Sequence, residues 1–293
     1  MFSPVNLNQI DAELTQLCQI LQTASAILQQ QYQQYCDGES FDIQSKDDTS
    51  PVTQADLLVH DFLVEKLREK DRNIPILSEE DSDVARQTWQ RFWLIDPLDG
   101  TKEFIKKTGE FTINLSLIEN GHSVISALAV PLHHCIYISR KGQLPYKWQW
   151  TNDHQISLSQ YHAENDTNNL PIDRPLKLAL SRSYKKYDDQ AQSYQQIIDL
   201  LEEKNIEYEL CFAGSAYKFC MMLEHQIDVY PRLHPTCEWD TAAGQGLLQS
   251  IGGEVFDLVH RPFMYNQRHR LLNGHFIAVR HVVLWEVLAE LYQ

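Results

Sequence analysis

The first third of the chain carries the spacing of two amphipathic helices. Apolar residues recur every three or four positions between 7 and 35, which predicts a helix whose glutamine-rich face is exposed to solvent. Thr53 and Asp56 have the spacing of a capping box and predict the start of a second helix. We expect this second helix to bury five residues: Leu57, Leu58, Phe62, Leu63 and Leu67.

Short apolar runs predict strands in the middle of the chain. A run at 74–77 leads into an acidic turn, and a second run at 92–95 ends at Asp96-Pro97, because proline cannot donate to a sheet ladder. Asn120-Gly121 separates two further runs and is typical of a tight hairpin turn. The remaining predicted strands of this part are 111–119, 124–130 and 136–139.

The second half of the chain alternates predicted strands with predicted helices. Polar residues with little periodicity at 147–175 indicate strand remnants and a long loop, which separates a lobe over 1–146 from a lobe over 176–293. The predicted strands of the second lobe are 176–181, 208–212, 227–230 and 254–258, and its helices are 192–204, 215–223 and 241–249. This alternation predicts an α/β architecture.

Composition and charge exclude several classes of protein. The 293 residues can bury a substantial core, and a hydrophobic fraction of 43% is ordinary for a globular protein. A net charge of −15 without a basic run argues against binding to a nucleic-acid polymer, and against a metal-dependent nuclease. Six cysteines without a C-x-x-C pair indicate reduced thiols. With no long apolar run or basic leader, we expect a cytoplasmic protein, and a peripheral contact with the inner membrane stays open.

Two aspartates at the end of a predicted strand suggest the first candidate chemistry. Asp96 and Asp99 can point into one cleft, and two anions held close together repel each other unless a cation lies between them. Gly100 and Thr101 follow, where free backbone N–H groups can hold a phosphate. The pattern therefore favours a metal site, although an Asp-Pro turn with an aspartate helix cap would explain the same residues.

Further carboxylates recur at the ends of predicted elements, without a paired cluster of histidine or cysteine. The full set is Asp47, Asp48, Asp56, Glu79, Glu80, Asp96, Asp99 and Asp240. Such oxygen ligands favour Mg²⁺ over zinc, and two such ions can assist both the attacking and the leaving oxygen of a phosphoryl transfer. Asp240 would also be a good helix cap without a metal, and we expect Asp56 to cap its helix and to support the site without binding metal.

Three segments together resemble the signature motifs of the inositol monophosphatase superfamily. They are Glu79-Glu80, the segment 96–101 and the segment 239–244. Within that superfamily, the segments 46–53, 77–81 and 101–106 resemble the bacterial type of 3'(2'),5'-bisphosphate nucleotidase. The resemblance extends in the right order from about residue 15 to residue 275. It implies a layered αβαβα fold of the mixed α/β class.

The resemblance also implies a role for each matching position. Two or three Mg²⁺ ions would be bound by Glu79, Asp96, the carbonyl of Leu98, Asp99 and Asp240. The catalytic set would be Asp48, Thr101 and Glu79, with Asp48 and Thr101 orienting and deprotonating the attacking water and Asp47 as the alternative to Asp48. The substrate would contact Glu79, Leu98, Asp99, Gly100, Thr101, Ser215, Lys218, Arg232 and Asp240. A helix cap and a surface lysine would explain Ser215 and Lys218 equally well.

Several features lie outside the implied metal set. Tyr184 stands where many relatives carry histidine, and His260-Arg261 precedes Pro262 where the family usually has a glycine. The segment 147–175 is longer than usual. We expect His133 and His134 to be incidental surface residues, and Cys220 and Cys237 to be buried small apolar side chains.

The resemblance implies a Mg²⁺-dependent phosphatase that acts on a small-molecule bisphosphate nucleotide. Adenosine 3',5'-bisphosphate would be hydrolysed to AMP and phosphate, with its 3'-phosphosulfate analogue as a second substrate, a link to sulfate assimilation and inhibition by Li⁺. The enzyme would be a monomer or a homodimer. The alternatives are a phosphatase of inositol phosphate or fructose 1,6-bisphosphate, and a non-catalytic module that binds Mg²⁺ and nucleotide.

Overall fold

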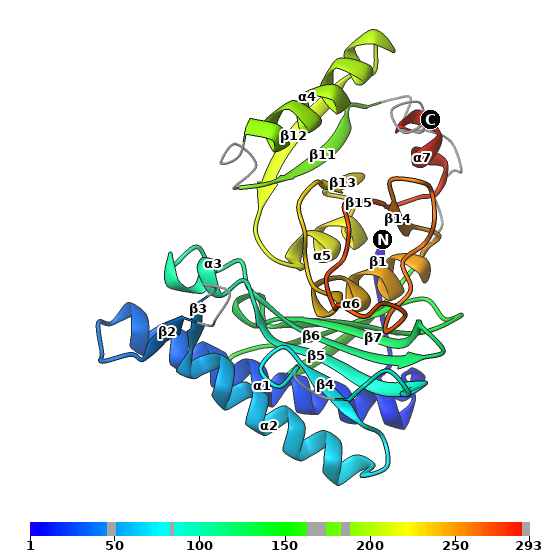
Figure 1. Ribbon diagram of the computed structural model, residues 1–293. Helices are drawn as coiled ribbons and strands as arrows, with labels where there is room; N and C mark the ends of the chain where they lie inside the picture. The colour runs from blue at the N-terminus through cyan, green and yellow to red at the C-terminus, as the bar shows by residue number, and fades with distance from the viewer. Residues whose placement is uncertain (46–50, 83–84, 163–173, 183–187, 289–293) are drawn as a thin grey trace.

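The protein folds into alternating layers of helix and sheet. The computed structural model describes residues 1–45, 51–82, 85–162, 174–182 and 188–288, without the side chains of Ser45, residues 188–193 and Val287. From the bottom of Figure 1 upward, the layers are helix, sheet, helix, sheet and helix. The predicted layered α/β fold is confirmed.

The larger sheet has eight strands in the order β1-β10-β9-β8-β7-β6-β5-β4. Its neighbours pair antiparallel, except that β4 runs parallel to β5. The strands are β1 (Phe2–Val5), β4 (Ile76–Ser78), β5 (Arg91–Asp99), β6 (Thr112–Glu119), β7 (His122–Val130), β8 (Cys135–Arg140), β9 (Tyr146–Trp150) and β10 (Ile156–Tyr161). Asn120 and Gly121, both with positive φ, form the predicted hairpin turn between β6 and β7.

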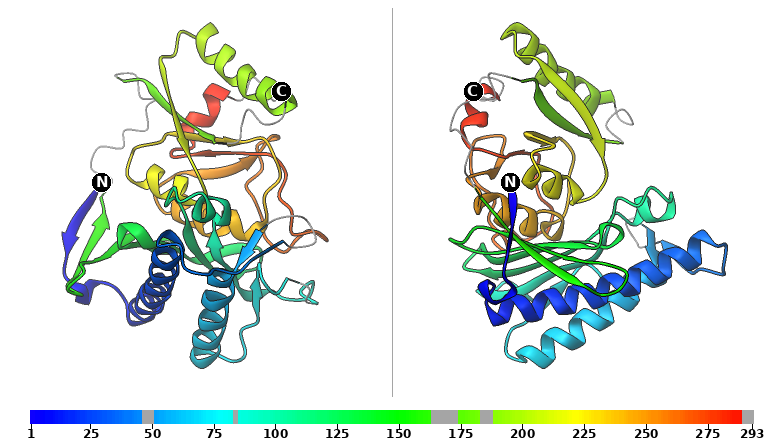
Figure 2. Two further views of the ribbon diagram at one scale, coloured as in Figure 1. Left: turned by 90° about the vertical axis from the view of Figure 1, so that its left-hand side faces the viewer. Right: turned by 180° about the vertical axis from the view of Figure 1, so that it is seen from behind.

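Helices α1 (Ala12–Cys36) and α2 (Gln54–Lys70) cover one face of this sheet, as Figures 1 and 2 show. A short 3₁₀ turn (Leu7–Gln9) precedes α1, and the predicted capping box of Thr53 and Asp56 opens α2. The prediction that α2 buries Leu57 and Leu58 is wrong, because both are exposed. Its buried face follows the four-residue spacing from Ala55 through Val59, Leu63 and Leu67, with Asp56 buried beside it and Phe62 packed at its edge.

The smaller sheet has five strands in the order β12-β11-β13-β15-β14. They are β11 (Leu176–Ser181), β12 (Tyr208–Ala213), β13 (Val229–Arg232), β14 (Glu254–Asp257) and β15 (Phe276–Val279). Helices α5 (Tyr217–Leu223) and α6 (Glu238–Gln249) lie between the two sheets, and α4 (Asp188–Glu203) and α7 (Val283–Leu288) cover the far face of the smaller one. The short elements α3 (Thr101–Ile105), η2 (Pro131–His133) and the hairpin of β2 (Ile43–Ser45) and β3 (Pro51–Thr53) complete the described chain.

Three buried cores hold the layers together. One joins α1 and α2 to the larger sheet, one joins that sheet through α5 and α6 to the smaller sheet, and one joins the smaller sheet to α4 and α7. Since apolar burial drives the association of layers, the middle core fixes the two sheets relative to each other. None of the helices in the described part of the chain has both the length and the apolar character needed to cross a membrane.

The strand predictions missed β1, β2, β3 and β15, and they differ from the structure in two further segments. Strand β5 does not stop at Asp96-Pro97, because it continues to Asp99 through a shift of register against β6. Asp96 pairs with Asn114 and Asp99 with Thr112, so β5 has one extra residue there, and a bulge of this kind accommodates proline. In the segment 147–175, β9 and β10 are complete strands, so the strand-remnant interpretation is wrong for these residues. The proposed lobe boundary stays a prediction.

Helix α6 approaches its neighbours closely because its inner face carries alanine and glycine. A Cβ atom on Gly244 would lie 2.2 Å from Cδ2 of the buried Phe219 ring on α5. A Cβ atom on Gly246 would lie 1.9 Å from Oγ of Ser126 on β7. No methyl group fits at such distances, so these glycines set how closely α6 packs against α5 and the larger sheet.

We expect Gly244→Ala to destabilise the protein. Overpacking a core typically costs about 1–3 kcal/mol, against a gain of at most about 1 kcal/mol when alanine replaces glycine in a helix. The free energy of unfolding, measured by urea titration and circular dichroism, should therefore fall. The matched control is Gly274→Ala, where an added Cβ meets nothing within 4 Å, and its stability should stay the same or rise slightly. Equal stability of Gly244→Ala and wild type would contradict the close packing.

Candidate metal and phosphate site

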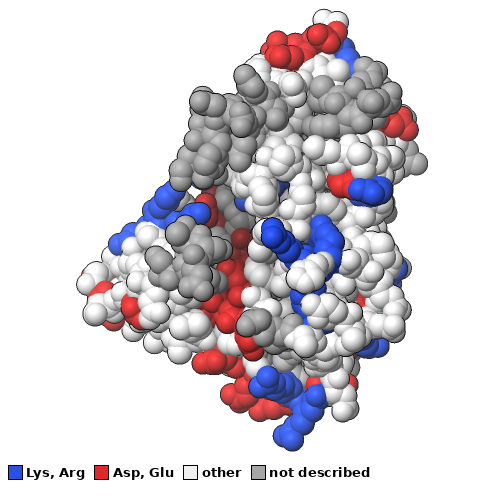
Figure 3. Space-filling view, viewed as in Figure 1, with Lys and Arg blue, Asp and Glu red and all other residues white. Residues whose placement is uncertain are grey.

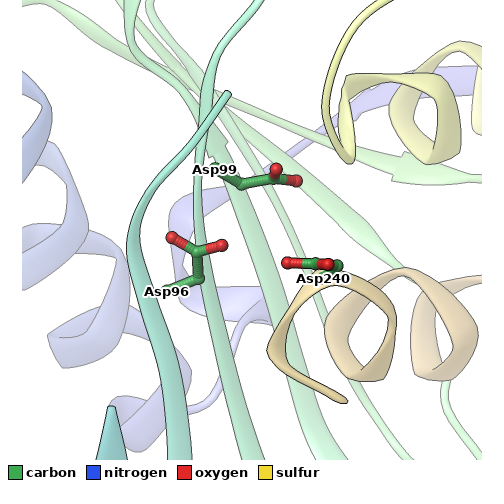
Figure 4. Close-up of side chains that lie close together, drawn as sticks. All are labelled: Asp96, Asp99 and Asp240. Atoms are coloured by element: carbon green, nitrogen blue, oxygen red, sulfur yellow. The ribbon is translucent and has the colours of Figure 1, made fainter. Parts of the chain in front are cut away.

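Three carboxylates from two separate elements meet between the larger sheet and α6. Asp96 and Asp99 lie at the end of β5, and Asp240 lies in the first turn of α6. One oxygen from each of them lies within 4.8 Å of the other two. Figure 4 shows the three side chains pointing toward one another. The structure therefore brings together these three residues of the predicted metal set.

Backbone N–H groups hold each of the three carboxylates in place. Asp96 Oδ1 accepts a hydrogen bond of 3.0 Å from the N–H of Leu98, two residues along the bulge. Asp99 Oδ2 accepts one of 2.5 Å from the N–H of Ala216, before α5. Asp240 Oδ2 accepts one of 2.7 Å from the N–H of Cys237, which closes a capping box on α6. The sequence predicts Asp240 at the N-cap, whereas the N-cap of α6 is Cys237 and Asp240 is the N3 residue of the capping box. This arrangement leaves the other oxygen of Asp240 for a ligand.

The close approach of the three carboxylates is electrostatically unfavourable when they are ionised. Burial, followed by the charges of Glu79, Asp99 and Asp240, raises the pKa of Asp96 well above its ordinary value. Burial also raises the pKa of Asp240. It raises the pKa of Asp99 to about 6, although the hydrogen bond from the Ala216 N–H partly opposes this shift. Asp96 Oδ2 is buried and has no hydrogen-bond partner among the described residues. A cation would satisfy this oxygen and offset the repulsion, and an all-oxygen donor set suits a hard ion such as Mg²⁺.

Glu79 lies at the edge of this cluster. It follows β4, and its N–H donates a hydrogen bond of 3.1 Å to the carbonyl oxygen of Ile95. Its charge contributes to the raised pKa values of both Asp96 and Asp240, but it is not part of the group within 4.8 Å. The structure therefore places Glu79 beside the cluster, and its role as a ligand stays a prediction.

Thr101 is held by α2 and by the bulge. Its Oγ1 lies 3.2 Å from Asp56 Oδ1 and 3.3 Å from the carbonyl oxygen of Leu98. Asp56 Oδ2 accepts hydrogen bonds from both the N–H and the hydroxyl of Thr53. Asp56 is therefore the helix cap that the sequence predicts, and it also orients Thr101. Asp47 and Asp48, the candidates for the catalytic acid–base residue, lie outside the described residues.

Gly100 occupies a position that only glycine fits well. It has a φ of +97°, and an added Cβ would lie 3.0 Å from the carbonyl oxygen of Glu110 and 3.1 Å from Cβ of Ser215. The start of α3 therefore lies directly against the turn that precedes α5. This contact brings the predicted phosphate-binding segment and the predicted nucleotide-binding segment together.

A cavity beside the cluster is lined by four of the nine predicted substrate residues. Asp99, Ser215, Arg232 and Asp240 line it, and so do Lys102 and Glu103, which the sequence analysis did not select. Figure 3 shows acidic side chains gathered in a hollow of the surface with basic side chains beside it. Arg232 is half-buried, its NH1 lies 3.4 Å from Oγ of Ser181, and its buried Nε has no partner among the described residues.

Lys218 is buried, which contradicts the surface-lysine interpretation. It is 0% exposed, and its Nζ donates hydrogen bonds to the carbonyl oxygens of Ala213 and Ser215. It is also absent from the described lining of the cavity. Ser215 has a φ of +46°, and its Oγ accepts a hydrogen bond from the N–H of Tyr217, but the N-cap of α5 is Ala216 and not Ser215.

Sequence reasoning missed Asn114 on β6. This buried amide donates to Asp99 Oδ2 at 3.3 Å and to the carbonyl oxygen of Trp239 at 3.2 Å, and thereby ties β5 to α6. In the sequence, Asn114 could have been recognised as a single amide side chain within the apolar run 111–119. Of the other expectations, His133 is exposed and Cys220 is buried as predicted. His134 is half-buried and stacks on Trp150, and Cys237 is only half-buried.

Among the departures from the family pattern, His260 lies in the described part of the chain. His260 takes the positive φ of +61° that glycine would adopt without strain, and its ring stacks on Trp285 at 4.9 Å. Tyr184 lies outside the described residues.

Comparison with known proteins points to one family. The family model described as the inositol monophosphatase family matches residues 10–291. The chain is 36% identical over 266 residues to the 3'(2'),5'-bisphosphate nucleotidase CysQ of Escherichia coli (strain K12), which covers 90% of this chain and 98% of that protein. It is 34% identical to the protein of the same name from Haemophilus influenzae, with 91% and 92% covered.

Solved structures show the same fold. The crystal structure of CysQ from Bacteroides thetaiotaomicron has a TM-score of 0.69 and 32% identity, and the match covers 89% of this chain and 94% of that one. The extragenic suppressor protein suhB from Bartonella henselae has a TM-score of 0.73 at 18% identity, which shows the fold alone. The chain therefore belongs to the inositol monophosphatase family.

Proposed function

We propose that the protein is a Mg²⁺-dependent phosphatase that hydrolyses adenosine 3',5'-bisphosphate to AMP and phosphate. The observation that carries the proposal is the convergence of Asp96, Asp99 and Asp240 beside a cavity that also contains Arg232. Relatives named 3'(2'),5'-bisphosphate nucleotidase support the class of substrate. The analogue that carries a phosphosulfate in place of the 5'-phosphate has the same 3'-phosphate and is the proposed second substrate.

The metal would be held by the three clustered aspartates, with Glu79 and the carbonyl oxygen of Leu98 as further ligands. The unpartnered buried oxygen of Asp96 and the all-oxygen donor set fit this assignment. When bound, Mg²⁺ lowers the pKa of water and stabilises the oxygen that leaves phosphorus.

The protein's own groups would orient the reactants. The Thr101 hydroxyl donates a hydrogen bond to Asp56 Oδ1 or to the Leu98 carbonyl oxygen, so the lone pairs of Oγ1 can accept a hydrogen bond from the attacking water. Burial raises the pKa of Asp56 to about 6, so at pH 7 it is mainly ionised and serves as an acceptor. Asp48 is the proposed base. The N–H groups of Gly100 and Thr101 would hold the phosphate under attack, and Arg232 the second phosphate.

A substrate panel tests the proposed reaction. We expect adenosine 3',5'-bisphosphate to be hydrolysed with a higher kcat/KM than inositol 1-phosphate, which has no second phosphate for Arg232, and than fructose 1,6-bisphosphate, which has no adenosine. Phosphate release should require Mg²⁺, disappear in excess EDTA and decrease with Li⁺. A preference for inositol phosphate would contradict the proposed substrate. Undiminished turnover in excess chelator would contradict the proposed dependence on Mg²⁺. Binding of nucleotide without any turnover would instead support a non-catalytic module.

Removal of one clustered carboxylate should abolish most of the activity. We expect Asp99→Ala to lower kcat by at least about a thousandfold, the magnitude typical for loss of metal-centred electrostatic stabilisation. The matched control is Asp81→Ala, which removes an exposed carboxylate near Glu79 but outside the cluster. Its kcat should stay within about twofold of wild type. If kcat fell by a comparable factor in both variants, activity would depend on the general negative charge of this region and not on the cluster.

Proton binding should compete with Mg²⁺ at the cluster. Since burial raises the pKa of Asp99 to about 6, this side chain is ionised at pH 7.5 and becomes protonated as the pH falls below 6. One competing proton of this pKa weakens apparent affinity about tenfold at pH 5. We expect calorimetric titration with Mg²⁺, without substrate, to show this loss between pH 7.5 and pH 5. An affinity that is independent of pH over this range would contradict the arrangement.

A further inference from the structure

The three clustered carboxylates share one pattern of hydrogen bonds. A backbone N–H donates to Oδ1 of Asp96, to Oδ2 of Asp99 and to Oδ2 of Asp240. None of the described residues donates to the other oxygen of any of these three side chains. Each aspartate therefore has one oxygen that the protein holds and one oxygen that is left for a cation.

The held oxygen of Asp99 has a second donor, the side chain of Asn114. The Nδ2 of this buried amide lies 3.3 Å from Asp99 Oδ2 and 3.2 Å from the carbonyl oxygen of Trp239. Both partners are acceptors, so the NH₂ group must face them, and the amide oxygen accepts a hydrogen bond of 2.8 Å from the hydroxyl of Thr112. The orientation of the amide is therefore fixed on both sides.

Asn114 is the one side chain that donates to the three aspartates among the described residues. The other donors are backbone N–H groups, which any sequence with this fold would supply. To bring Oδ2 of Asp99 to a cation as well, the hydrogen bonds from Ala216 and Asn114 would both have to break. Bonds to an ionised carboxylate are among the stronger hydrogen bonds in proteins. Asp99 is therefore restricted to its Oδ1 as a ligand.

The number of oxygens that a carboxylate offers distinguishes two common divalent cations. Ca²⁺ accepts about six to eight oxygens in a flexible arrangement and often takes both oxygens of one carboxylate. Mg²⁺ demands a nearly ideal octahedron with shorter bonds and keeps several water molecules. A cluster in which each aspartate presents a single, fixed oxygen suits Mg²⁺ and withholds the additional oxygens that Ca²⁺ would use.

We propose that Asn114 determines the specificity of the cluster for Mg²⁺ over Ca²⁺, because it holds Oδ2 of Asp99 and limits this carboxylate to one ligand oxygen. Asn114 is a positioning residue, since it acts through Asp99 and does not itself contact the ion. The inference rests on the proposed function, which takes the cluster to bind a divalent cation, and it deepens that function by naming the residue that selects the ion.

The first test measures ion binding without substrate. Asn114→Leu removes the donor, fills a similar volume and leaves little room for a replacement water. Calorimetric titration of the chelator-treated protein at pH 7.5 should show that the Kd for Mg²⁺ rises by about 10- to 100-fold, the usual effect of losing a residue that orients a ligand. The Kd for Ca²⁺ should change by no more than about threefold, because its coordination tolerates a carboxylate that turns to offer both oxygens.

The matched control is Ser116→Ala. Ser116 is a buried polar residue two positions further along β6, so its side chain lies on the same face of the strand. Its hydroxyl accepts a hydrogen bond from Ser123 and not from the groups that hold the carboxylates. Both Kd values should stay within about twofold of wild type. If Asn114→Leu raised the two Kd values by the same factor, Asn114 would support the cluster without selecting the ion, and the inference would be overturned.

The second test uses wild-type protein, so it does not depend on whether Asn114→Leu folds. In crystals grown with Mg²⁺, Asp99 should bind the ion through Oδ1 alone. Its Oδ2 should stay within hydrogen-bond distance of the Ala216 nitrogen and of Asn114 Nδ2. Coordination of Mg²⁺ by both oxygens of Asp99 would overturn the inference.

The outcomes separate this inference from the proposed function. If wild type binds neither ion, the proposed metal site fails, and the inference fails with it. If wild type binds Mg²⁺ and hydrolyses adenosine 3',5'-bisphosphate, but Asn114→Leu leaves the ratio of the two Kd values unchanged, the proposed function stands and only the inference is overturned.

Discussion

The repulsion between buried carboxylates is the constraint on which the rest of this structure depends. Asp96, Asp99 and Asp240 would separate in an unstructured chain, because ionised groups in a poorly solvated site repel each other and lose hydration. Each is instead held by a backbone N–H from a different place: the bulge of β5, the turn before α5 and the start of α6. The site therefore exists only while these three elements stay docked, and the layers must be rigid enough to keep them so.

Helix α6 contributes most to keeping these elements docked. It brings Asp240 to the cluster, and its glycine and alanine face lets it lie close to both α5 and the larger sheet. Asn114 adds a polar link, since its amide contacts both Asp99 and the backbone of Trp239. Because the middle core packs around the same helix, the interactions that stabilise the fold also set the distances within the site.

Most of the elements, and the residues of the cluster, could be predicted from the sequence. Periodicity located α1, α2 and the central strands, and the spacing of Asp96, Asp99 and Asp240 in family motifs identified the carboxylates that meet. The errors arose where tertiary contacts override local preference. A bulge lets β5 continue past Pro97, and the direction of Leu57 and Leu58 depends on where α2 meets the sheet. No local pattern indicates that Lys218 is buried, because its partners are carbonyl oxygens that only the folded turn places there.

The distribution of charge explains how so acidic a chain can attract an anionic substrate. The net charge is −15, but ionic strength screens exposed charges beyond about 8 Å under physiological conditions. The local field in the cavity therefore matters more than the total. The lining of the cavity contains both signs of charge, because Asp99 and Asp240 lie there together with Lys102 and Arg232. Under the proposed function, a cation at the aspartates would offset their repulsion of a phosphate, so recognition of the substrate would depend on occupancy of the metal site.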